Sequence, residues 1–183
     1  MSMIVQPKPS MVSRSGWGAT AVDLSKTSNL KNPAYIIVHH AGDANDAIIK
    51  AYPDEKAAMR RYQQIHIGQE WGDIGYHYCI GINGTILEGR TDTKEGIHAP
   101  GYNYRSIAVM LHGNYDIRSF TSTQQNKLID ILAWLCYKNN ISPSNILGHK
   151  DVTATTCPGS GIYSKLSSIR GLVMDRVYPQ PQQ

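Results

Sequence analysis

The side chains that could do chemistry in this 183-residue chain include seven histidines and three cysteines. Cys157 lies in the stretch LGHKDVTATTCPG (147–159), eight positions after His149 and directly before a proline and a glycine. Because the stretch has almost no bulky apolar residue after Val152, it offers little core for a thiol to fill. Cys157 is therefore a candidate metal ligand, whereas Cys79 and Cys136 lie in apolar segments and are expected to be buried thiols.

Two histidines are placed where ligands gather in open sheets. The apolar run AYIIVHH (34–40) predicts a buried strand that ends on a histidine pair, of which His39 is the first, and His149 follows a short predicted strand. Two imidazoles and one thiolate leave the fourth position of a tetrahedral zinc open for water, whose pKa zinc lowers to about 7. The chain contains no HExxH, HxxEH or CxxC motif, so spacing alone does not single out this set.

The elements that must position these residues alternate between strands and helices. We expect strands at 34–40, 106–115 and 145–147, a hairpin at 76–90 around Asn83-Gly84, and helices at 53–68, at 120–140 and through Ile162, Leu166 and Ile169. Thr121 and Gln124 have the spacing of a capping box. One connection is a hairpin, and the strands and helices do not follow a regular series of βαβ units. The predicted fold class is therefore α/β, a single domain with a mixed central sheet flanked by helices.

Composition excludes several other classes of protein. The formal net charge of +4 is spread along the chain without a nucleic-acid-binding motif, so no nucleic-acid partner is expected. Three cysteines cannot all pair within one chain, which argues against a disulfide scaffold. We find neither a signal peptide nor an apolar segment of membrane-spanning length, so we expect synthesis in the cytoplasm and no membrane insertion.

Five segments carry a resemblance to a known family, and they are, in order, SRSGWGA (13–19), YIIVHH (35–40), WGDIGYHYCIGINGTILEGR (71–90), GIHAPGYNYRSIAVMLHGNYD (96–116) and LGHKDVTATTCPG (147–159). They resemble the zinc N-acetylmuramoyl-L-alanine amidases, which include phage amidase lysozymes and the peptidoglycan recognition proteins of animals. The resemblance implies a peptidoglycan recognition protein-like amidase fold. It also implies an N-terminal arm (1–11), a catalytic domain (12–177) and a C-terminal tail or linker (178–183).

The resemblance assigns roles to individual residues. It puts the ligands of a Zn²⁺ cofactor at His39, His149 and Cys157, and the catalytic tyrosine at Tyr76. Phage lysozymes have a lysine at the position of Thr155, whereas amidase-active recognition proteins have a threonine there. Thr155 is expected to support an oxyanion together with Tyr76.

The resemblance also suggests which residues meet the substrate. His98 and Asn103 correspond to the loop that lines the peptide groove, and His77 is expected to be close behind them as a further substrate-binding residue. Tyr76, His77 and His98 are the alternatives for the group that passes a proton to the leaving amine. His40 is expected to point to the opposite face of the sheet.

The implied activity is hydrolysis of the amide bond between N-acetylmuramic acid and L-alanine in peptidoglycan. We expect a monomeric bacteriolytic endolysin or autolysin that reaches the cell wall at lysis or by a non-standard route. The absence of cysteine in 41–66 favours a bacterial or phage protein. Two alternatives are a non-catalytic recognition module and a cytoplasmic amidase that recycles anhydro-muropeptides. Cys157 weighs against both, because such relatives often lack this ligand or replace it with aspartate.

Overall fold

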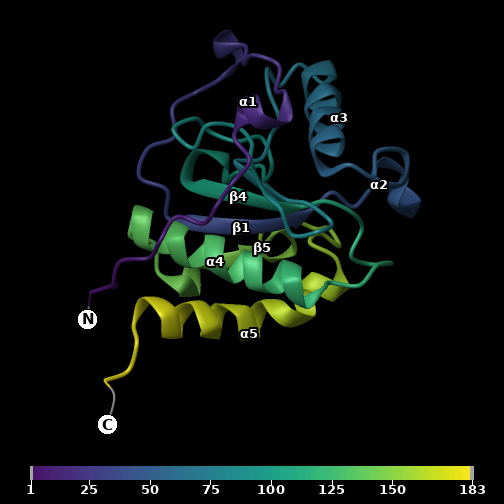
Figure 1. Cartoon of the computed structure of the whole chain (residues 1–183). Helices are drawn as coiled ribbons and strands as arrows, with labels where there is room; N and C mark the ends of the chain where they lie inside the picture. Colours follow the sequence, from purple (N-terminus) through teal and green to yellow (C-terminus); the bar gives the residue numbers. More distant parts are fainter. Residues whose placement is uncertain (1, 182–183) are drawn as a thin grey trace.

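A mixed five-stranded sheet forms the centre of the protein in a computed structural model, which describes residues 2–181 (Figure 1). Residue 1 of the predicted arm and residues 182–183 of the predicted tail lie outside the described residues. The strands, in spatial order, are β3 (Ile86–Glu88), β2 (Tyr78–Ile80), β4 (Ser106–Leu111), β1 (Tyr35–His40) and β5 (Ile146–Gly148). All neighbours are parallel except β2 and β3, which form the predicted hairpin. The predicted fold class is confirmed.

Helices cover both faces of the sheet. The helices are α1 (Arg14–Trp17), α2 (Ala47–Ala51), α3 (Glu55–Gly68), α4 (Ser122–Asn139) and α5 (Ser160–Val177). In Figure 1, α4 and α5 lie below the sheet, and α1 and α3 lie above it. No helix among residues 2–181 is both long and apolar enough to cross a membrane.

Alternation along the strands gives each face its own core. Ile36 and Val38 of β1 join the larger cluster, which α4 and α5 complete. On the other face, Met110 of β4 packs with Met59 of α3 and Trp17 of α1 in a smaller cluster. His39 is also on the α3 side, because it is one residue out of phase with Val38.

Local capping fixes the two long predicted helices. The side chain of Asp54 accepts a hydrogen bond from the backbone of Ala57 at the start of α3. Thr121 and Gln124 form the predicted capping box at the start of α4. The hairpin turn also agrees with its sequence signal, because Gly84 has a φ of 87°, which glycine adopts without steric cost.

Residues 12–17, which directly follow the expected N-terminal arm, form structure that the sequence-based expectations did not include. Val12 forms an isolated parallel bridge with Leu87, and the short helix α1 follows it and buries Trp17. The helix α2 is likewise absent from the sequence-based expectations. Elements of four or five residues are too short to show a hydrophobic period.

Candidate metal and catalytic site

The pairing of β1 with β5 brings two predicted ligands together. Val38 is opposite Gly148 in this parallel pair, so the next residues are His39, still on β1, and His149, directly after β5. Their ring centroids are 4.5 Å apart. Both residues therefore stand at the carboxyl ends of parallel strands, where open sheets hold their ligands.

Cys157 returns to this edge through the loop after β5. The backbone N–H of Lys150 donates to the carbonyl of Cys157 at 2.8 Å, which folds the loop back on itself. The Cys157 Sγ is buried, 3.6 Å from His39 Nδ1. The ligand atoms of His39, His149 and Cys157 all lie within 4.8 Å of one another.

The donor set of these three residues fits zinc. Zinc–ligand bonds of about 2.0–2.3 Å in a tetrahedron separate two ligand atoms by about 3.4–3.7 Å, close to the Sγ–Nδ1 distance here. The Nε2 atom of His149 is buried and has no hydrogen-bond partner among residues 2–181. An unpartnered ring nitrogen beside a buried thiol is a costly arrangement unless a ligand completes it.

Burial shapes the protonation of these groups. It lowers the pKa of His39 well below its usual value and lowers that of His149, so both rings are neutral and able to coordinate a metal. It raises the pKa of the Cys157 thiol to about 12. Binding of a metal cation would therefore displace a proton from this thiol.

Asp116 and His40 hold the Cys157 loop from the other face of the sheet. The carboxylate of Asp116 accepts hydrogen bonds from Thr156 Oγ1 and from the backbone N–H of Ser160, both at 2.9 Å. His40 Nδ1 accepts the backbone N–H of Tyr115 at 3.0 Å, which places the segment before Asp116. His40 thus points away from His39, as predicted. No local pattern marks Asp116, because its partners are about 40 residues away.

Tyr76 lies beside the predicted ligands. Its ring centroid is 5.1 Å from that of His39 and 5.6 Å from that of His66. Burial raises the pKa of Tyr76 above its usual value, so its hydroxyl keeps its proton at neutral pH. The segment before it is fixed by the buried Arg90, which donates to the carbonyl oxygens of Ile74 and Trp71, both at 2.8 Å. Sequence reasoning missed Arg90, whose acceptors are all main-chain groups.

Thr155 is close to Cys157 and exposed. Its Oγ1 accepts the backbone N–H of Cys157 at 3.2 Å. Because a hydroxyl can accept and donate at once, its own hydrogen remains available to another acceptor. The structure thus supplies two hydroxyl donors, Tyr76 and Thr155, near the predicted ligands.

The structure shows the hydrogen-bond partners of His98 and Asn103, whose contact with substrate stays a prediction. His98 is buried, and its Nδ1 lies 2.9 Å from Nε2 of His39, so it contacts a predicted ligand. The side-chain oxygen of Asn103 accepts the backbone N–H groups of His98 and Ala99 at 3.0 and 2.9 Å. Asn103 therefore fixes the loop that carries His98.

His77, the third predicted substrate-binding residue, is held by main-chain groups. Its Nδ1 accepts the backbone N–H of Ala108 at 2.9 Å, so its Nε2–H donates to the carbonyl of Lys94 at 2.7 Å. Burial lowers its pKa to about 4, which keeps the ring neutral. Both ring nitrogens of His77 are therefore engaged by main-chain groups, and its contact with substrate stays a prediction.

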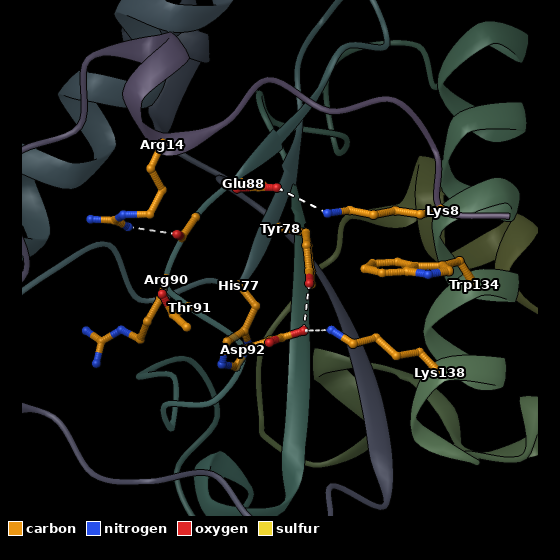
Figure 2. Close-up of a pocket in the computed structure, with 11 residues that line it drawn as sticks. Lys8, Arg14, His77, Tyr78, Glu88, Arg90, Thr91, Asp92, Trp134 and Lys138 are labelled. Atoms are coloured by element: carbon orange, nitrogen blue, oxygen red, sulfur yellow. Dashed lines mark hydrogen bonds and ion pairs between the residues drawn. The ribbon is translucent and has the colours of Figure 1, made fainter.

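A hollow of about 180 Å³ lies apart from these residues, near the hairpin and α4 (Figure 2). None of the predicted zinc ligands lines it, and both lysines that line it form ion pairs within the protein. Lys8 bonds Glu88 at 3.5 Å, and Lys138 bonds Asp92 at 2.6 Å. Both lysines lie over the ring of Trp134. The hollow marks where the N-terminal arm is attached to β3 and α4.

Comparisons with known proteins agree with this geometry. A family model described as N-acetylmuramoyl-L-alanine amidase matches residues 29–160, which include the predicted ligands and Tyr76. Peptidoglycan-recognition protein LB of Drosophila melanogaster is 33% identical over 161 residues, covering 86% of this chain and 68% of the relative. The endolysin of Enterobacteria phage T3 is 36% identical over 111 residues, covering 58% of this chain and 72% of that protein.

Solved structures show the same fold. A variant of Drosophila PGRP-LB in complex with tracheal cytotoxin has a TM-score of 0.74 and 29% identity, covering 94% of this chain and 96% of its own. The N-acetylmuramoyl-L-alanine amidase LysC from Clostridium intestinale URNW has a TM-score of 0.70 and 30% identity, covering 88% of this chain and 97% of its own. The chain therefore belongs to the N-acetylmuramoyl-L-alanine amidase family.

Proposed function

We propose that this protein hydrolyses the amide bond between N-acetylmuramic acid and L-alanine in peptidoglycan, with zinc as its cofactor. The observation that carries the proposal is the convergence of His39, His149 and Cys157 within 4.8 Å beside Tyr76. Family membership supports the same reaction, since LysC is described as an N-acetylmuramoyl-L-alanine amidase.

Each residue of the site has a distinct task in this reaction. His39, His149 and Cys157 would hold zinc, which supplies Lewis acidity and activates water as a nucleophile near neutral pH. The hydroxyls of Tyr76 and Thr155 donate hydrogen bonds to the oxygen of the scissile carbonyl as it gains negative charge.

Hydrolysis also requires a proton on the departing amine of L-alanine. His77 has both ring nitrogens engaged by backbone groups, and the nitrogens of His98 face His39 and Ser106. Of the three groups first considered for this transfer, Tyr76 is the one that remains. Its hydroxyl, which is protonated at neutral pH, can give its proton to the amine and is then reprotonated by water or by another group.

We further propose that the partner is peptidoglycan, bound by a monomer, and that the protein is made in the cytoplasm and reaches the wall at lysis or by a non-standard route. The resemblance to the phage T3 endolysin supports a lytic role, and the complex of PGRP-LB with tracheal cytotoxin supports a ligand of wall origin. The similarity to recognition proteins favours one competing function, recognition without cleavage.

The test is hydrolysis of purified peptidoglycan by chelator-treated protein before and after zinc is restored. We expect new L-alanine amino groups only with zinc, and none from Cys157→Ser under the same conditions. Binding of peptidoglycan by zinc-loaded protein without any new amino group would instead establish a recognition module.

A further inference from the structure

His39 has two ring nitrogens, and the structure gives each a different neighbour. Nδ1 faces the Cys157 Sγ at 3.6 Å, and Nε2 lies 2.9 Å from Nδ1 of His98. Both imidazole rings are buried. His39 can bind a metal through Nδ1 only if its single hydrogen is on Nε2.

The hydrogen-bond partners of His98 decide where that hydrogen is. The hydroxyl of Ser106 lies 2.7 Å from the carbonyl of Tyr102, which can only accept, so Ser106 donates its one hydrogen there. The Ser106 oxygen, 3.2 Å from Nε2 of His98, must then accept. His98 therefore carries its hydrogen on Nε2.

The same reasoning extends one ring further. A neutral His98 with a hydrogen on Nε2 has a lone pair on Nδ1, which can only accept. The 2.9 Å contact is then a hydrogen bond donated by Nε2 of His39. This leaves the Nδ1 lone pair of His39 directed at Cys157 and the predicted metal position.

We propose that Ser106 and His98 form a hydrogen-bond relay that holds His39 in the tautomer able to bind zinc through Nδ1. This inference rests on the proposed zinc site. Ser106 and His98 are positioning residues in it, because they act through His39. If these hydrogen bonds ran in the opposite direction, His39 would carry its hydrogen on Nδ1, where it would occupy the position of the metal.

Other contacts keep the relay rigid. Ser106 is fully buried at the first position of β4, where it pairs with Tyr35 of β1. The side-chain oxygen of Asn103 accepts the backbone N–H groups of His98 and Ala99, which fixes the backbone around His98. Partners of metal-binding histidines commonly change metal affinity about 10- to 100-fold when removed.

Nuclear magnetic resonance of the metal-free protein reads the tautomers directly. Long-range ¹⁵N–¹H correlations should show hydrogen on Nε2 of both His39 and His98. A hydrogen on Nδ1 of His39 in the wild-type protein would overturn the proposal, whatever the variants do.

Zinc affinity, measured by competition with a chromophoric chelator, supplies the second test. We expect Ser106→Ala to weaken binding about 10- to 100-fold and to populate the second tautomer of His39. Ser106→Thr, which keeps the hydroxyl, should restore affinity, and Ser168→Ala on the exposed face of α5 should not change it. Unchanged affinity and tautomers in a folded Ser106→Ala variant would refute the relay.

These readouts separate the relay from the proposed reaction. Protein that shows the expected tautomers and the Ser106→Ala loss of affinity, yet cleaves no peptidoglycan, would retain the relay and lose the amidase assignment. Protein that cleaves peptidoglycan but carries the hydrogen of His39 on Nδ1 would retain the amidase assignment and lose the relay.

Discussion

Asp116→Ala should loosen the loop that carries Cys157. The substitution removes the hydrogen bonds to Thr156 and Ser160, on either side of Cys157. Because Gly159 has no side-chain cap to offer, Asp116 is the group that caps the start of α5. Loss of such a cap costs about 1 kcal/mol, and loss of a negative charge near a helix N-terminus about 0.3–1 kcal/mol. We expect the free energy of unfolding to fall by about 1–2 kcal/mol.

The same free energy should be lost from zinc binding if the loop must be ordered to present its thiolate. A loss of 1–2 kcal/mol corresponds to about 5- to 30-fold weaker affinity. Urea unfolding of the metal-free protein and chelator competition measure the two quantities. Asp175→Ala at the other end of α5 is the matched control. If Asp116→Ala lowers stability but leaves zinc affinity at the wild-type value, the loop does not need Asp116 to place Cys157, and this reasoning is refuted.

Three further outcomes are expected. Tyr76→Phe should lower turnover about a hundredfold without changing zinc affinity, and weaker zinc binding would point to a structural role. Cys157→Ser should remove bound zinc in native mass spectrometry, and full occupancy would exclude Cys157 as a ligand. His77 and His112 have pKa values lowered by burial to about 4 and about 3, below the usual 6.5. Below pH 6.5 the unfolded chain therefore binds more protons than the folded protein. The free energy of unfolding should fall by up to about 2 kcal/mol for each ring between pH 7 and pH 5. Urea unfolding curves that are equal at pH 7 and pH 5 would contradict this.

Elements with a strong local signal were predictable from the sequence. The strand ending at His40, the Asn83-Gly84 hairpin and the Thr121 capping box all occur as expected. Their signals come from neighbouring residues, so no tertiary information is needed. The expected strand at 106–115 is shorter, because β4 ends at Leu111 and the chain turns at Gly113, where φ is 103°.

The ligand cluster was predictable for a different reason. His39 and His149 lie at the carboxyl ends of parallel strands. The sequence indicates this position, because each histidine follows a run of apolar residues. The pairing register that makes them adjacent is not visible there, and Cys157 joined them through the family resemblance. Their binding of zinc remains a prediction.

The hydrogen-bond partners of the other histidines could not be predicted from the sequence. His77 and His98 lie in segments that resemble an active site, yet their partners are main-chain groups or the distant Ser106. A residue type indicates which hydrogen bonds are possible, whereas only the packed structure shows which partners are present. Asp116 and Arg90 were missed for the same reason.

Digestion of peptidoglycan in H₂¹⁸O tests the proposed reaction most directly. Hydrolysis of the predicted amide places one ¹⁸O atom in the lactyl carboxylate of N-acetylmuramic acid and releases stem peptides that begin with unlabelled L-alanine. Mass spectrometry should find this pattern with zinc-restored protein and not with Cys157→Ser. Label at a sugar reducing end or in a stem-peptide carboxylate, or the same label without zinc, would contradict the proposed zinc amidase.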